Sequence, residues 1–148
     1  MDLILWRHAD AEDGFVDAER RLTPKGVKQA ARVAKWLTKR LPADAMIIVS
    51  PARRAQETAL ALTDDFRTVK DVGTGVSAEQ LLAAADWPEA GRTVVIVGHQ
   101  PVLGEAAALI MTGKSAQWNI KKGAVWWLAQ RDKSDKPQLR AVIGPDLV

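Results

Sequence analysis

Short runs of apolar residues alternate along the chain with longer segments whose apolar residues recur every three or four positions. Three of the runs are continuously apolar and rich in Val, Ile and Leu, namely residues 3–6, 46–49 and 94–97. A run of this kind is typical of a strand that is covered on both faces of a parallel sheet. These segments therefore predict the central strands of a sheet.

Helices are predicted between and after these strands. Their expected ranges are residues 23–41, 51–62, 77–85 and 101–111, which carry apolar residues at helical spacing. In the first of these helices, the residues expected on the buried face are Val27, Ala30, Ala31, Ala34 and Leu37.

The C-terminal part of the chain predicts two more strands. Residues 124–130 and 139–143 flank the polar stretch 131–137, which is the pattern of a hairpin, whereas residues 66–75 predict only a weak strand and a loop. The order of the elements predicts an α/β fold, a three-layer α/β/α sandwich with a mostly parallel central sheet. With 148 residues, 47% of them hydrophobic, we expect one domain over residues 1–148.

Each predicted central strand runs directly into polar residues. Arg7 and His8 follow the first strand, residues 50–54 follow the second, and Gly98 and His99 follow the third. The carboxyl ends of parallel strands share one edge of the sheet, and ligand crevices lie outside that edge. The chain has only two histidines, and we expect both of them at this site.

Each of these residues also has an ordinary structural interpretation. A single histidine near a strand end is usually a hydrogen-bonded structural residue. Ser50 and Pro51 alone are typical of a helix N-cap followed by proline at the first helical position. The joint placement of two histidines with arginines favours a site. Arg53 and Arg54 are neighbours in a first helical turn and must point in different directions, so we expect one to be a solvated surface charge.

The arginines and helix N-termini at this edge predict a site for an oxyanion. A guanidinium group binds phosphate or carboxylate through two parallel hydrogen bonds, and a helix N-terminus also favours an anion. A neutral histidine there can attack phosphorus, while the second donates a hydrogen bond to the developing charge. The chain has no Gly-rich phosphate loop with a Walker-type lysine. It has no cysteine, which excludes disulfides, thiolate metal sites and cysteine nucleophiles.

Composition gives little support for a nucleic-acid or membrane partner. The formal net charge is only +3, from 21 Lys and Arg against 18 Asp and Glu. Lys121 and Lys122 are interpreted as solvated charges. No apolar stretch approaches the roughly 20 residues that span a bilayer, and no signal-peptide pattern opens the chain, so we expect a cytoplasmic protein.

Four of the six tryptophans fall in predicted strands or helices, which favours core roles over base stacking: Trp6, Trp36, Trp126 and Trp127.

Four motifs in order along the chain resemble the histidine phosphatase superfamily, also called phosphoglycerate mutase-like. They are Arg7-His8-Ala9, then Leu22-Thr23 with Gly26 and Gln29-Ala30, then Ser50-Pro51 with Arg54-Ala55 and Thr58-Ala59, then Val97-Gly98-His99 with Pro101. The short chain resembles the small SixA-type phosphohistidine phosphatases of that family. The resemblance implies a phosphoglycerate mutase-like fold.

The same resemblance implies roles for five residues. His8 matches the nucleophile that becomes transiently phosphorylated, and His99 matches the second catalytic histidine. Arg7 and Arg54 match the two phosphate ligands, and both are included in the catalytic set. Arg20 lies near a position where small members also carry arginine, and we treat it as a candidate substrate contact. No metal and no cofactor are implied.

The implied activity is hydrolysis of a phosphoryl group from phosphohistidine on a protein, through a phosphohistidine enzyme intermediate. Two alternatives stay open: a non-catalytic module that binds a phosphoprotein or phosphometabolite, and a small-molecule phosphomonoesterase. The expected partner is a phosphorylated protein, with a histidine-phosphotransfer domain as one candidate, or a small phosphorylated substrate.

The chain departs from the family pattern at three points. Ala9 stands where the family usually has glycine, and we expect an ordinary backbone conformation there. Glu57 replaces the usual glutamine before Thr58. Larger members carry an acidic proton donor in an inserted segment, for which residues 62–93 offer no convincing counterpart. The candidates by location alone, all interpreted as surface charges, are Asp71, Glu79 and Asp86.

Overall fold

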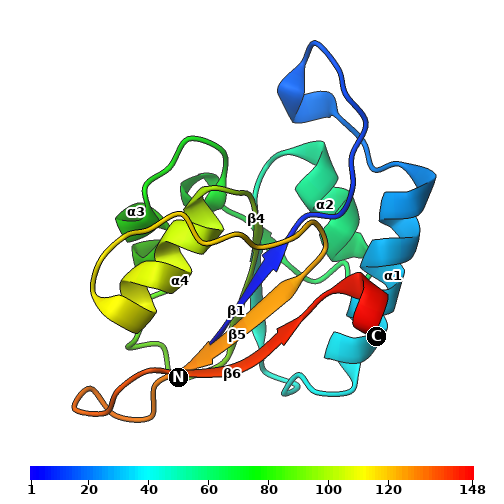
Figure 1. Ribbon diagram of the computed structural model, residues 1–148. Helices are drawn as coiled ribbons and strands as arrows, with labels where there is room; N and C mark the ends of the chain where they lie inside the picture. The colour runs from blue at the N-terminus through cyan, green and yellow to red at the C-terminus, as the bar shows by residue number, and fades with distance from the viewer.

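A computed structural model describes all 148 residues, and its strands form one six-stranded sheet between two layers of helices (Figure 1). The strands are β1 (Asp2–Arg7), β2 (Met46–Val49), β3 (Arg67–Thr68), β4 (Val94–Gly98), β5 (Val125–Ala129) and β6 (Gln138–Ile143). Their order across the sheet is β3-β2-β4-β1-β5-β6. The first four in this order pair in parallel, whereas β5 and β6 pair antiparallel as the expected hairpin. The predicted α/β sandwich is confirmed, with a sheet that is mixed.

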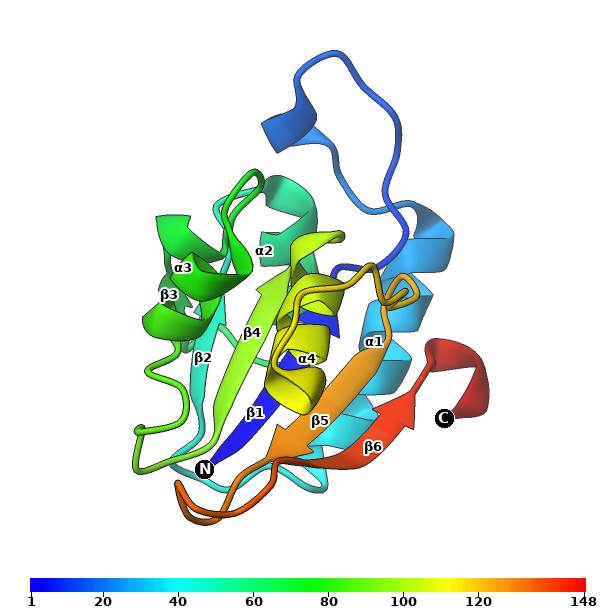
Figure 2. The same cartoon turned by 60° about the vertical axis from the view of Figure 1, so that its left-hand side comes forward.

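Helices cover both faces of this sheet. They are α1 (Pro24–Thr38), α2 (Arg53–Leu60), α3 (Ala78–Ala84) and α4 (Val102–Thr112). Figures 1 and 2 show α1 and α2 on one face and α3 and α4 on the other. Leu3 and Leu5 of β1 pack into the core on the α3 and α4 side, and Ile4 and Trp6 pack into the core against α1 and α2. The continuous apolar runs are therefore explained by burial on both faces.

The buried face of α1 differs from the expected one. Val27 is 56% exposed and Ala31 is also exposed, although both were predicted to be buried. Gly26 is buried instead, because the helix approaches Asp10 so closely that a Cβ at this glycine would lie 2.0 Å from the Asp10 carbonyl oxygen. This contact sets the rotation of the helix and turns Val27 to solvent. The predicted residues that are buried are Ala30, Ala34 and Leu37.

The start of α2 differs from the prediction, whereas the weak strand and loop predicted after α2 are present. Helix α2 has Ala52 as its N-cap, so the prediction that Ser50 caps it is wrong. The Ser50 hydroxyl accepts a hydrogen bond from the Ala52 N–H at 3.2 Å and also contacts His99. The weak strand and loop expected over residues 66–75 are confirmed as the short β3 and a 3-10 helix, Lys70–Val72. No helix of the structure has the length and apolar character needed to cross a bilayer.

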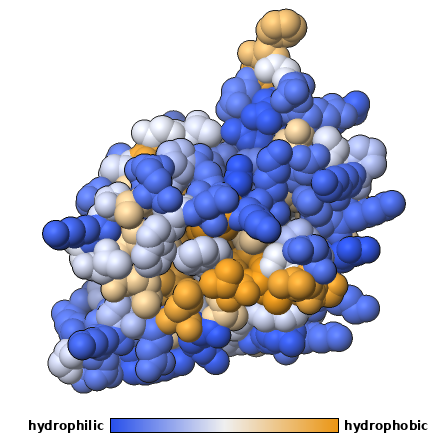
Figure 3. Space-filling view, in the orientation of Figure 1, coloured by the Kyte–Doolittle hydropathy of each residue, from blue (hydrophilic) through white to orange (hydrophobic).

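The segment between β1 and α1 projects from the body beyond the carboxyl end of β1 (Figures 1 and 2). It contains a 3-10 helix, Asp17–Glu19, and closes with an isolated bridge between Ala11 and Leu22. Phe15 in this segment is fully exposed and Val16 is 56% exposed. Figure 3 shows the apolar tip of the projection above a hydrophilic surface. This projecting loop, residues 12–21, stands directly above the carboxyl edge of the sheet.

Candidate active site

His8 and His99 lie side by side because their strands are parallel neighbours. Arg7 of β1 pairs with Gly98 of β4, so the next residue of each strand emerges at the same edge. The His8 main-chain N–H donates to the Gly98 carbonyl oxygen at 3.0 Å. The ring centroids are 5.2 Å apart, and the two residues are 7% and 3% exposed. The expectation that both histidines meet at one edge is confirmed.

The His8 ring is held with Nε2 free of a proton. Its Nδ1 lies 2.8 Å from the Ala9 carbonyl oxygen, and because a carbonyl only accepts, Nδ1 is the nitrogen that carries the hydrogen. Burial, assisted by the charges of Arg54 and Arg7, lowers the pKa of His8 to about 4. At neutral pH the ring is therefore uncharged and its Nε2 lone pair is available. The backbone of Ala9 is ordinary, as predicted, since Asp86 is the only non-glycine residue with positive φ.

The His99 ring is fixed by a residue that the sequence analysis interpreted only as a helix cap. His99 Nε2 lies 2.7 Å from the Ser50 hydroxyl oxygen, which orients the ring. Burial and the neighbouring His8 lower the pKa of His99 to about 3, so this ring is also neutral. The signal available in the sequence was that Ser50 follows β2 directly, at the same edge as both histidines.

The two adjacent arginines point in different directions, as expected. Arg54 is only 4% exposed, and its Nη1 and Nη2 donate to the main-chain and Oδ2 oxygens of Asp17 at 2.8 and 3.1 Å. Arg53 is exposed, and its Nε lies 3.0 Å from the carboxylate of Glu57. The buried arginine of the pair is the one that the motif predicts for the site.

Three buried side-chain nitrogens have no partner within the protein. They are Arg7 Nε, Arg54 Nε and His99 Nδ1. An unsatisfied buried donor costs about 1–3 kcal/mol, and such groups in a folded protein call for an explanation, which a functional role often provides. All three belong to the four residues predicted for the site. A cluster of two guanidinium groups and an imidazole with spare hydrogen-bonding capacity suits an oxyanion ligand.

Asp17 is the carboxylate of the site that the sequence analysis missed. Its oxygens accept hydrogen bonds from Arg54 and, at 3.2 Å, from Arg20, and these contacts lower the pKa of Asp17 below its usual range. The carboxylate is thus ionised at neutral pH and occupies guanidinium nitrogens at the site predicted for an oxyanion. The three acidic candidates from residues 62–93 are exposed, as predicted for surface charges: Asp71, Glu79 and Asp86.

Arg20 and Glu57 hold the projecting loop in place. Arg20 Nε donates to the Glu12 carbonyl oxygen at 2.7 Å, and the Arg20 charge contributes to the lowered pKa of His8. Glu57 Oε1 accepts from the Leu22 N–H at 2.8 Å. The glutamate that departs from the family pattern therefore anchors the base of the loop and binds Arg53 on its other oxygen.

The different environments of the two adjacent arginines give a testable contrast. If Arg54 is the phosphate ligand that the motif predicts, Arg54→Ala should remove a charge-assisted contact of about 1.5–3 kcal/mol and lower kcat/KM by about 10- to 100-fold. Arg53→Ala should leave kcat/KM nearly unchanged and change the free energy of unfolding by less than about 0.5 kcal/mol, because its ion pair is exposed. Steady-state kinetics and denaturant unfolding of both variants measure this, and equal losses would contradict the assignment.

Comparisons with known proteins agree with the motifs and the geometry. Residues 3–74 match the model of the histidine phosphatase superfamily (branch 1). A protein from Picosynechococcus sp. is 33% identical over 136 residues, which cover 84% of this chain and 82% of that protein.

Solved structures share the fold at low sequence identity. The protein histidine phosphatase SixA complexed with tungstate superposes with a TM-score of 0.84 at 21% identity, over 99% of this chain and 98% of that one. A phosphoserine phosphatase from Entamoeba histolytica superposes with a TM-score of 0.71 at 19% identity, over 95% of each chain. The shared fold thus accommodates phosphatases of different substrates.

Proposed function

The chain belongs to the histidine phosphatase superfamily, and we propose that it is a phosphohistidine phosphatase that removes the phosphoryl group from a histidine of a protein. The observation that carries this proposal is the pair of neutral, buried histidines beside two arginines with unpartnered nitrogens. The similarity to SixA, a protein histidine phosphatase that binds the oxyanion tungstate, supports the same substrate class.

In the first step, His8 Nε2 attacks phosphorus. A new Nε2–P bond forms as the P–N bond of the substrate breaks, and the leaving imidazole takes the electron pair and a proton from water or from a neighbouring donor. The hydrogen bond from Nδ1 to the Ala9 carbonyl stabilises the positive charge that develops on His8. The lowered pKa of His8 ensures that the nucleophile is unprotonated across the neutral pH range.

Arg7, Arg54 and His99 act on the phosphoryl oxygens. The two guanidinium groups neutralise their charge and orient phosphorus towards His8, and His99 donates to an oxygen from the nitrogen that carries its hydrogen. Ser50 keeps the His99 ring in this position. Asp17 must give up Arg54 nitrogens when the phosphoryl group arrives, because both groups use the same donors.

In the second step, water attacks the phosphorus of phosphorylated His8. The Nε2–P bond breaks, inorganic phosphate leaves, and the neutral imidazole is restored. The same three residues stabilise the charge on phosphorus in both steps, so one site serves formation and hydrolysis of the intermediate.

Release of inorganic phosphate from a phosphohistidyl protein tests the proposal. A histidine-phosphotransfer domain phosphorylated on histidine is a suitable substrate, with phosphoserine and an alkyl phosphate assayed beside it. We expect catalytic turnover of the phosphohistidyl protein, with many molecules of phosphate released per enzyme molecule. Stoichiometric binding without release would instead identify a phosphoprotein-binding module, and turnover confined to the alkyl phosphate would identify a phosphomonoesterase.

A further inference from the structure

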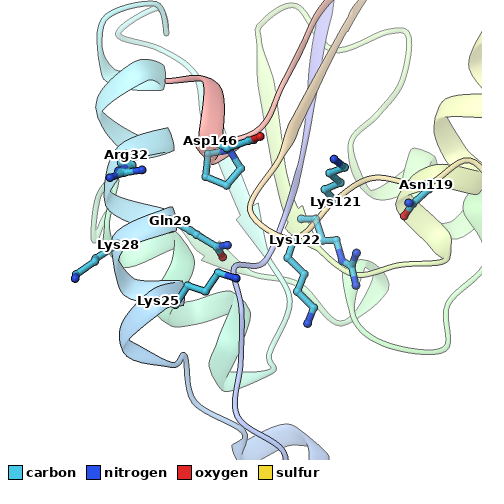
Figure 4. Close-up of a pocket in the computed structure, with 10 residues that line it drawn as sticks. Lys25, Lys28, Gln29, Arg32, Asn119, Lys121, Lys122 and Asp146 are labelled. Atoms are coloured by element: carbon cyan, nitrogen blue, oxygen red, sulfur yellow. The ribbon is translucent and has the colours of Figure 1, made fainter.

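A basic pocket of about 700 Å³ lies beside the phosphoryl site, and Arg7 forms part of its wall. In Figure 4, Lys25 and Gln29 extend from α1 towards the loop that carries Lys121 and Lys122. Further lining residues are Lys28, Arg32, Asn119, Pro145 and Asp146. Six of the ten lining residues are cationic and only Asp146 is acidic, so the pocket selects for negative charge.

The cations of this pocket are mostly unpaired. Lys122 alone among them forms an ion pair, at 3.1 Å from Asp10. Lys25 lies in the first turn of α1, which contains no acidic residue. A helix dipole disfavours a cation at that end, so Lys25 does not serve the stability of the helix. Cavities for small metabolites are lined mainly by apolar side chains, whereas no hydrophobic residue lines this one.

The loop on the far side of the pocket is fastened to the strand that presents the nucleophile. Arg7 Nη1 donates to the Ile120 carbonyl oxygen at 2.8 Å. The Gly123 N–H donates to the carbonyl oxygens of Arg7 and His8, at 3.1 Å each. Lys121 and Lys122 lie between these two anchor points. A ligand whose phosphoryl group binds Arg7 therefore meets the basic pocket immediately beside it.

We propose that this pocket is a second anion subsite, which binds carboxylate side chains close to the phosphorylated residue of a protein substrate. The inference rests on the proposed function and adds to it the charge of the surface that the enzyme recognises. Lysine ammonium groups bind carboxylates as point charges and tolerate varied geometry, which suits a protein surface.

The projecting loop favours a protein over a small polyanion. Phe15 is fully exposed two residues before Asp17, whose carboxylate is bound to Arg54 of the phosphoryl site. Aromatic side chains are enriched at protein interfaces. A protein substrate can contact both this aromatic residue and the basic pocket, whereas a metabolite bound at Arg7 would leave Phe15 in solvent. The pocket offers no aromatic side chain on which nucleic-acid bases could stack.

Two phosphohistidine peptides test the subsite, one with Glu and Asp flanking the phosphorylated residue and one with Gln and Asn in their place. We expect KM for the acidic peptide to be lower by about tenfold at low ionic strength, with similar kcat. The difference should disappear at about 0.5 M salt, where the Debye length is only a few Å. Equal KM values for the two peptides at low ionic strength would overturn the proposal.

Matched charge variants locate the effect. Lys25→Gln with Lys121→Gln should abolish the preference for the acidic peptide. Lys35→Gln with Lys136→Gln removes the same net charge from exposed residues outside the pocket and should keep the preference. Retention of the preference in the first double variant, or equal loss in both, would contradict a site in this pocket.

Direct binding separates this inference from the proposed catalysis. Calorimetric titration with the unphosphorylated acidic peptide should show binding that the Lys25 and Lys121 double variant loses. Such binding supports the subsite even if no phosphohistidine is hydrolysed, a result that would overturn only the proposed function. Absence of binding, or tighter binding of a single-stranded oligonucleotide than of the peptide, would overturn the subsite even in an active phosphatase.

Discussion

His8→Ala should lower phosphate release by at least about 10³-fold and abolish covalent labelling of the enzyme, because His8 is the residue that we propose to carry the phosphoryl group. His8 is the neutral imidazole whose Nδ1–H is committed to the Ala9 carbonyl, which leaves Nε2 as the nucleophile. Rapid mixing with substrate labelled in the phosphoryl group, followed by a basic quench, should trap the label on the wild-type chain. The label should be lost in acid, as expected for a P–N bond.

His99→Ala provides the matched control for this experiment. It removes the second buried imidazole but leaves His8 in place, so labelling should persist while turnover falls. Because His8 is almost fully buried, the circular dichroism and thermal unfolding of both variants must match the wild type before their kinetics are compared. Label recovered on His99 in the wild-type chain would reverse the assignment of the two histidines.

The strands and the meeting of the two histidines follow directly from sequence. The runs at residues 3–6 and 94–97 have no polar residue on either face, and their short length and branched side chains are typical of strands in a sheet covered on both sides. Once these strands are parallel neighbours, the residues that follow them must share an edge, and His8 and His99 do so.

The details that sequence could not predict depend on tertiary contacts. The rotation of α1, which exposes Val27, is set by the close contact between Gly26 and the main chain of Asp10. The spacing of apolar residues does not predict this contact. Asp17 reaches Arg54 from a projecting loop without apolar periodicity. Ser50 has the local pattern of a helix cap, and only the approach of His99 from β4 gives its hydroxyl another partner. For Val27 and Ser50 a longer-range contact overrides the local pattern, and for Asp17 no local pattern indicates the contact.

A preference for P–N over P–O bonds is the second large effect that we expect. Release of an alkoxide from a phosphomonoester normally needs a positioned general acid, which contributes about 10²–10⁴-fold in rate. The leaving imidazole of phosphohistidine has a pKa near 6.5 and needs little assistance from an acid. Asp17 is the carboxylate bound to Arg54, the proposed phosphate ligand, and its lowered pKa keeps it ionised and unable to donate a proton at neutral pH. We therefore expect kcat/KM for phosphohistidine to exceed that for an alkyl phosphate by at least about 10²-fold.

Carboxylate variants test the reason for this preference. Asp17→Asn removes the charge that competes with phosphate for Arg54 but keeps the main-chain oxygen that Arg54 also binds. It should therefore retain phosphohistidine hydrolysis and lower KM, because the phosphoryl group no longer displaces a carboxylate. The exposed positions provide the control set, since each of these variants should behave as the wild type: Asp71→Asn, Glu79→Gln and Asp86→Asn. Comparable efficiency on alkyl phosphates that one of the four variants loses, while it keeps phosphohistidine hydrolysis, would instead reveal a carboxylic acid that protonates the leaving group.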